Sequence, residues 1–195
     1  MNAAEIAESL YFLNASESTI CKERVMAHPL WFERKFDFSF PVELYPEIIE
    51  RLRGTPARLE ERVENIEAGR LTARDGDKWS IQENIGHLLD LDELFAARFD
   101  DYKQGSPTLR VADLQNQKTH EAQHNRRPLA EILGEFRRAR LALVQQLESQ
   151  PPEYFRRTAL HPRLNTPMRV TDLLYFVAEH DDHHLARITE LLRAR

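Results

Sequence analysis

The sequence predicts an all-α protein, a four-helix bundle with an N-terminal extension. Four long segments of the 195-residue chain carry apolar residues at helical spacing, and two long connections separate them. Only 6 of the 195 residues are glycine, well below the usual share of about 7%. The chain therefore has few glycines for the repeated tight turns of an all-β fold. A chain of this length buries about 70% of its unfolded surface, which is enough for a core.

The first 37 residues form the predicted extension, and the bundle is expected over residues 38–195. Residues 1–25 read either as a stretch upstream of a natural start at Met26 or as a docking arm. The segment 31–38 alternates aromatic and charged residues without a partner strand. No basic stretch precedes an apolar one, and no run of 18 apolar residues could span a bilayer, so we expect a cytoplasmic protein that does not enter membranes.

Residues 43–53 form the first predicted helix, because Leu44, Ile48 and Leu52 recur at intervals of four. The run Gly54-Thr55-Pro56 is expected to interrupt it. Thr55 would then cap a second piece that begins at Pro56 and ends near residues 68–69.

The strongest helical pattern runs over residues 80–102. It opens with a capping box, in which the Ser80 hydroxyl accepts a backbone N–H and the Glu83 carboxylate accepts another in return. A Gly-Ser-Pro sequence ends it at residues 105–107. Its apolar stripe consists of Ile81, Ile85, Leu88, Leu91, Phe95 and Phe99.

Two more helices complete the expected bundle. Residues 106–127 are polar and predict a long loop with a helical turn or two, followed by a helix over residues 128–148. Residues 158–170 contain two prolines and predict a crossover or a small hairpin. The pair Thr171-Asp172 then caps a last helix that runs to about residue 193.

Charge and cysteine content exclude several classes of function. The formal net charge of −5 disfavours nucleic-acid binding, which needs cations to displace counterions from phosphates. The single cysteine, Cys21, excludes an intrachain disulfide, and its place in the extension makes it a poor nucleophile. Nucleotide-binding glycine loops and the GxSxG pattern of hydrolases are absent from the sequence.

Histidines interrupt the apolar seam of the last helix, which reads Leu173, Val177, His180, His184, Ile188 and Leu191. His180 and His184 are four residues apart, so both rings leave one face and can reach one ion. Two unpaired imidazoles in an apolar core would each cost desolvation free energy, and a shared metal removes that cost. Hydrogen-bonded core histidines are the alternative reading of the same spacing.

His87 is the expected third ligand, because it lies on the flank of its helix that meets the core. Three histidines leave a coordination position open, as in catalytic metal sites. His183 is a second choice, since it lies on the flank of the seam. Asp90, Glu179 and Asp181 could orient the ring nitrogens, although solvated helix charges are the commoner role of such residues.

A second histidine pattern, His120-Glu121-Ala122-Gln123-His124, matches the HExxH sequence of zinc peptidases. Its neighbours are almost entirely polar, whereas a buried active-site helix needs apolar flanks. We interpret it as a chance match.

Three segments resemble the DinB/YfiT-like superfamily: Trp79-Ser80, Gly86-His87-Leu88-Leu89-Asp90, and His180-Asp181-Asp182-His183-His184-Leu185-Ala186-Arg187-Ile188. In that family, one histidine of the second bundle helix and an HxxxH pair of the last bind a divalent metal. By position these are His87, His180 and His184, the same trio. The resemblance covers roughly residues 38–195 and implies a bundle of up-down-down-up type, a homodimer in many members, and zinc or nickel on the histidines.

The resemblance also implies two hypotheses about function. The first is a metal-dependent thiol transferase or hydrolase acting on a small molecule, with the metal activating a low-molecular-weight thiol or water. Asp181 and Asp90 are its candidate bases, and Arg126 and Arg127 could receive an anionic substrate. The second is a non-enzymatic metal-binding stress-response protein.

Overall fold

The computed structural model describes residues 29–194, and the chain divides into two units after Glu33. In the first unit, Trp31–Glu33 (η1) form one 3-10 turn, closed by a 3.0 Å hydrogen bond from the Glu33 N–H to the Leu30 carbonyl. The interpretations of residues 1–25 and of Cys21 lie outside the described residues. The second unit begins at Arg34, a few residues before the boundary that the sequence predicts.

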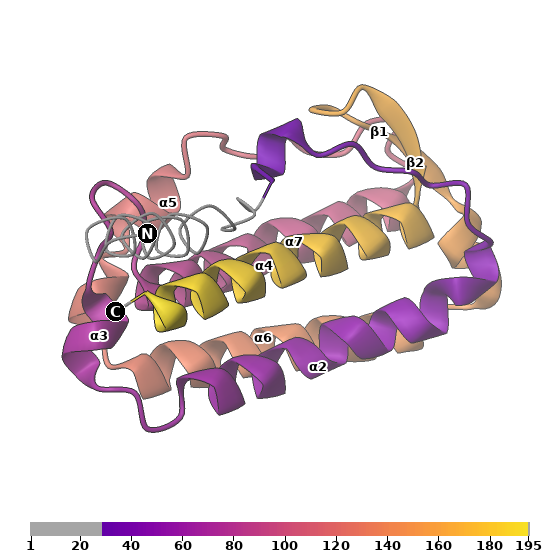
Figure 1. Ribbon diagram of the computed structural model, residues 1–195. Coiled ribbons are helices and arrows are strands. Elements are labelled where there is room, and N and C mark those ends of the chain that lie inside the picture. The colour runs from indigo at the N-terminus through magenta and orange to yellow at the C-terminus, as the bar shows by residue number, and fades with distance from the viewer. Residues whose placement is uncertain (1–28, 195) are drawn as a thin grey trace, which may run out of the picture. The chain divides into compact units, whose positions relative to one another are not determined.

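The second unit is a four-helix bundle, as predicted, made of α2 (Tyr45–Val63), α4 (Ile81–Gln104), α6 (Leu129–Glu148) and α7 (Val170–Arg193). Helices α2 and α4 each pack against both α6 and α7. Figure 1 shows α4 and α6 running in one direction and α2 and α7 in the other, which is the up-down-down-up order. Within residues 29–194, no helix combines the length and apolar character needed to cross a membrane.

Short elements connect the four helices. The expected long loop between α4 and α6 contains two helical turns, and the expected hairpin between α6 and α7 is present, with Thr158 paired to Arg169 in antiparallel register. The connecting elements are η2 (Val42–Leu44), α3 (Ala68–Thr72), α5 (Gln117–Glu121), η3 (His124–Arg126), η4 (Pro152–Arg156), β1 (Thr158–His161) and β2 (Thr166–Arg169).

Helix α2 corrects one sequence expectation, because it continues through Pro56 instead of restarting there. The proline removes a single backbone N–H, and residues on both sides of it, from Ile49 to Leu59, bury one continuous face. Thr55 is therefore no N-cap. Its hydroxyl points into the bundle and donates to the Asp181 carboxylate at 2.8 Å.

Helix α4 has the ends that the sequence predicts. The Ser80 hydroxyl accepts the Glu83 N–H at 3.1 Å, and the Glu83 carboxylate accepts the Ser80 N–H at 2.9 Å. At the other end, Gly105 adopts the left-handed conformation with φ of 72°, which glycine enters without steric cost. These caps fix the residues at which α4 begins and ends.

A buried polar network joins all four helices at the centre of the bundle. The Arg140 guanidinium on α6 donates to Asp92 on α4, at 2.6 Å for its closest contact, and to Asp181 on α7. Thr55 on α2 completes the network through Asp181. Burial raises the pKa of the Asp92 carboxyl to about 6, because one guanidinium faces two carboxylates away from water. This network was not predicted from the sequence.

The aromatic segment before α2 packs along α7 and forms no strand. Phe36 lies against Phe176 with ring centroids 5.0 Å apart, and Phe40 lies 5.1 Å from Tyr175. The Arg169 guanidinium donates to the Phe40 carbonyl at 3.0 Å. The alternating pattern thus reflects an extended strap that places every second side chain on one helix.

Candidate metal centre

Three histidines converge between α4 and α7. One ligand atom from each of His87, His180 and His184 lies within 4.8 Å of the others, and within residues 29–194 no second group of metal-ligating side chains meets this condition. The three residues are 3%, 4% and 7% exposed. The Nε2 atoms of His180 and His184 are 3.3 Å apart. Two nitrogens bound to one tetrahedral zinc at about 2.0–2.1 Å would have much the same separation.

The His184 ring is oriented by an amide on the neighbouring helix. The Asn84 Nδ2 group donates to the Ser80 carbonyl at 2.8 Å, so the Asn84 Oδ1 atom faces the His184 Nδ1 atom, also at 2.8 Å. An amide oxygen can only accept, so Nδ1 of His184 carries the proton. Its Nε2 atom therefore presents a lone pair to the centre of the cluster.

The His87 ring has a hydroxyl partner on the α4–α6 connection. Its Nδ1 atom lies 3.1 Å from the buried Thr119 hydroxyl oxygen. When Nδ1 donates to this oxygen, the other ring nitrogen is free of a proton and can act as a ligand. The polar loop of the sequence analysis thus contributes to the site, and neither Thr119 nor Asn84 was identified there.

Burial favours the neutral form of two of these rings. It lowers the pKa of His87 to about 4, even though the charge of nearby Asp90 acts in the opposite direction. Burial also lowers the pKa of His180 well below its ordinary value, and the neighbouring rings of His87 and His183 add to the effect. Neutral imidazole is the form that binds metal, so these two rings can act as ligands near neutral pH.

Aromatic rings form the walls of the site. The Trp79 ring lies 4.6 Å from His87 and 6.3 Å from His184 between centroids. The Phe95 ring meets His180 edge-on at 6.0 Å. An apolar wall on two sides leaves the imidazoles as the polar groups that a ligand would meet here.

The HExxH pattern does not form a metal site on one helix. Helix α5 ends at Glu121, and Gln123 takes the left-handed conformation before His124 begins η3. His120 is exposed, whereas His124 is buried with its Nε2 atom 2.8 Å from the Asp90 carboxylate. Asp90 therefore holds His124 of the α4–α6 connection, and Thr119 is the residue whose side chain contacts the His87 ring nitrogen.

The remaining candidates are engaged elsewhere. Asp181 is fully buried and bound by Arg140 and Thr55. Glu179 accepts from Arg51 at 2.8 Å on the outer side of α7. Two loop arginines have local partners, Arg126 with Gln123 and Arg127 with Glu135. His183 lies half-buried beside the cluster but outside it.

We expect Gly86→Ala to lower the free energy of unfolding by about 1–3 kcal/mol, because a Cβ at position 86 would overlap the His124 ring. The matched control is Gly54→Ala in α2, where an added Cβ meets nothing within 4 Å. There the same change should raise the free energy of unfolding by about 0.5–1 kcal/mol. Urea denaturation measures both, and two changes of equal sign would contradict the close packing of His124 on α4.

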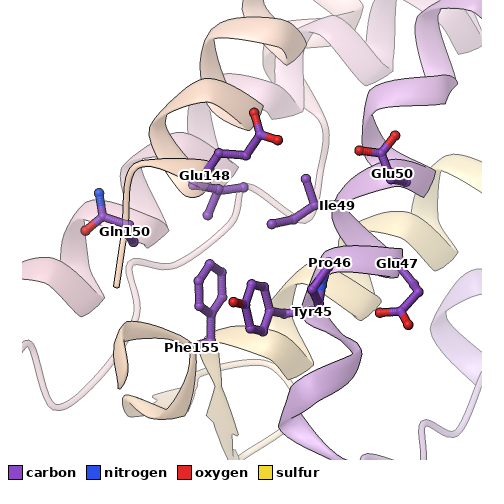
Figure 2. Close-up of a pocket in the computed structure, with 9 residues that line it drawn as sticks. Tyr45, Pro46, Glu47, Ile49, Glu50, Glu148, Gln150 and Phe155 are labelled. Atoms are coloured by element: carbon purple, nitrogen blue, oxygen red, sulfur yellow. The ribbon is translucent and has the colours of Figure 1, made fainter. Parts of the chain in front are cut away.

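A surface cavity of about 430 Å³ lies elsewhere, between the start of α2 and the end of α6. Figure 2 shows the Tyr45 and Phe155 rings facing one another below the carboxylates of Glu50 and Glu148. Arg53 donates to both carboxylates, and no histidine or cysteine lines the cavity.

Comparison with known families identifies the same region of the chain. A family model described as the DinB superfamily matches residues 51–188, which is more than half of the chain and includes all three histidines. The protein YfiT of Bacillus subtilis (strain 168) is 29% identical over 154 residues, covering 74% of this chain and 82% of YfiT.

Two solved structures share the fold. The structure of YfiT, described as a "probable metal-dependent hydrolase with an unusual four-helix bundle topology", aligns with a TM-score of 0.72 at 24% identity, over 83% of this chain and 93% of that one. The mycothiol-dependent maleylpyruvate isomerase aligns with a TM-score of 0.59 at 10% identity, over 75% of this chain and 60% of that one.

Proposed function

The chain belongs to the DinB superfamily, and from this membership we propose that it is a metal-dependent thiol transferase or hydrolase acting on a small molecule. His87, His180 and His184 would hold one divalent ion, with zinc or nickel as the proposed metals. The convergence of three buried imidazoles is the observation that carries the proposal. The description of YfiT as a metal-dependent hydrolase, and the thiol dependence of the isomerase, support the two reaction classes.

A divalent ion at this site would supply a Lewis acid, which lowers the pKa of a thiol or water molecule toward neutrality. The chain's own residues prepare the site for it. Asn84 holds the proton of His184 on Nδ1, and the Thr119 hydroxyl is the hydrogen-bond partner of His87, so two of the rings are oriented in advance. Trp79 and Phe95 keep the surroundings apolar, which strengthens the electrostatic effect of any charge placed there.

The two carboxylates considered as bases are occupied by other partners. Asp90 is bonded to His124, and Asp181 is bonded to Arg140 and Thr55. We therefore assign the protein no carboxylate base. In the proposed reaction, the proton released by the thiol or water leaves to solvent or to the substrate's leaving group.

The function is tested by turnover of an electrophilic model substrate by the metal-loaded protein, with a series of thiols and with water alone. We expect turnover that His180→Ala abolishes and that His120→Ala leaves intact, because His120 is exposed and outside the cluster. Turnover that survives His180→Ala would overturn the metal mechanism.

The near-complete burial of the three histidines favours a second candidate, a non-enzymatic metal-binding stress-response protein. A closed site of this kind would stabilise the fold by binding the native state alone. It predicts a large fall in Tm on metal removal, with no turnover for any thiol or ester.

The cellular setting is proposed on the same basis. We propose a cytoplasmic homodimer in which residues 38–195 form the functional domain and residues 1–37 an extension. Its partners would be a small-molecule substrate and a low-molecular-weight thiol, without nucleic acid or membrane.

A further inference from the structure

A second group of basic side chains lies beyond the histidine cluster, where the hairpin meets α4 and α7. It consists of Arg98 on α4, His161 at the end of β1, and Arg163 in the hairpin turn. The Arg98 Nη1 atom is 3.2 Å from the His161 Nε2 atom. The His161 ring lies 5.2 Å from the Phe176 ring between centroids, and the Arg163 guanidinium lies 5.5 Å from the same ring.

Arg98 is a buried guanidinium that lacks a carboxylate partner within residues 29–194. It is 2% exposed, its Nε atom donates to the Arg110 carbonyl at 3.0 Å, and its Nη2 atom has no hydrogen-bond partner among those residues. Asp101, one turn further along α4, is held instead by the Arg110 side chain and backbone, at 2.7 and 2.9 Å. A buried guanidinium that bonds no carboxylate directly and leaves an N–H group unused is costly, so its retention points to a ligand.

His161 leaves a further N–H group without an acceptor at the same place. The Leu164 N–H lies 3.2 Å from its Nδ1 atom, and the Arg98 Nη1 group lies 3.2 Å from its Nε2 atom. A neutral imidazole has only one acceptor nitrogen, so it cannot accept from both groups. The N–H group that is left over, together with the unused Nη2 group of Arg98, forms a set of donors that an oxygen anion would satisfy.

The group lies close to the histidine cluster. Phe176 precedes His180 by one turn of α7, a rise of about 6 Å. On α4, Phe95 touches His180 and precedes Arg98 by three residues. A small molecule bound at the histidines could therefore extend its other end to Arg98.

We propose that Arg98, His161 and Arg163 bind an oxyanion group of the substrate, a carboxylate or a phosphate. The site would thus select acidic small molecules, with Arg98 as the buried anchor and the partly exposed Arg163 at its edge. The assignment of this group to a substrate rests on the proposed function, whereas the binding of an anion does not.

The local electrostatics agree with this placement. Burial, with Arg98 and Arg163 nearby, lowers the pKa of His161 to about 4. Burial also lowers the pKa of the Arg98 guanidinium, and the charges of Arg163 and Arg110 act in the same direction. A bound anion would offset the repulsion within the group.

The test measures anion binding by the full-length protein after metal removal with a chelator. Tm is followed against inorganic phosphate or succinate, at constant ionic strength set with sodium chloride, for the wild type, Arg98→Met and Arg163→Gln. Arg156→Gln is the matched control, an exposed arginine on η4 that pairs with Glu43. In the wild type and the control, Tm should rise with the logarithm of the anion concentration above the dissociation constant and should gain about 5–10 °C at one hundred times that constant.

Arg98→Met should weaken binding at least tenfold and should melt within about 3 °C of the wild type in chloride alone. No rise in the wild type with either anion would overturn the proposal, as would an unchanged rise in Arg98→Met. If Arg98→Met does not fold, Arg163→Gln decides in the same way. Because the protein is metal-free, the Tm shift reports anion binding alone, and its failure is distinguishable from failure of the proposed metal function. The anion that binds more tightly, phosphate or succinate, indicates which group the substrate carries.

Discussion

Replacing Arg140 with alanine is expected to lower the free energy of unfolding by about 3–5 kcal/mol, the largest effect on stability that we predict. The variant would keep Asp92 and Asp181 at 2% and 0% exposure without the guanidinium that binds both. Uncompensated carboxylates in a core are far more costly than the loss of the attraction alone. Urea denaturation monitored by circular dichroism measures the change.

The effect of Arg140→Ala should shrink as the pH falls. In the wild type, the folded-state pKa of Asp92 is already raised to about 6, so the folded protein binds more protons than the unfolded chain between about pH 4 and pH 6. Without Arg140 this pKa rises further. Protonation then relieves the buried charge, and the variant recovers part of its stability between pH 7 and pH 5.

Arg138→Ala is the matched control, because Arg138 is an exposed residue of the same helix. It should change the free energy of unfolding by no more than about 0.5 kcal/mol. A loss below about 1 kcal/mol in Arg140→Ala at pH 7 would show that the two carboxylates do not depend on the guanidinium.

The wild-type protein, purified without a histidine tag, should contain about one divalent metal per chain. Each of His87→Ala, His180→Ala and His184→Ala should lose it, because two imidazoles hold such an ion much more weakly than three. Elemental analysis gives the stoichiometry, and competition with a chromophoric chelator gives the change in affinity.

Thr119→Val provides a graded test of the same site. It removes the hydroxyl that faces His87 and keeps the side-chain shape, so metal affinity should fall by about 10–100-fold, less than for any ligand. His120→Ala should retain the full metal content. Metal that depends on His120 and His124, or no metal in the wild type, would contradict the three-histidine site.

Sequence periodicity predicted the convergence of the histidines because a helical face is a local property. His180 and His184 occupy positions of the apolar seam, and that seam is buried along most of α7. The same argument placed His87 in the interior, because side chains on the core-facing flank of a bundle helix converge with those of the facing helices. Asn84 lies three residues before His87 and therefore on the same helix face. The same reasoning applies to it, although it was not among the predicted site residues.

Features that depend on contacts between distant segments were not predictable in this way. Thr119 meets His87 because the α4–α6 connection returns over α4, and loop paths leave no periodic signal. The central network had a partial signal, since Asp92 and Arg140 fall among apolar stripe residues. The stripe was drawn through Leu91, however, which is only half-buried, while Asp92 is buried.

The expected break at Pro56 failed for a related reason. Local propensity favours a helix end there. The free energy gained by burying apolar residues on both sides of the proline exceeds the free-energy cost of one missing hydrogen bond. Tertiary packing therefore decided the length of α2. Its continuity is what brings Thr55 to Asp181.

Two adjacent residues of α7 belong to separate structures, His180 to the histidine cluster and Asp181 to the central network. The stability of the fold and the proposed metal binding thus depend on different residues, but both require the same rotation of one helix. A descendant could exchange all three histidines and inherit an intact bundle. The side chains at the histidine positions can change in evolution, because the central network of Arg140, Asp92 and Asp181 holds the helices in place independently of them.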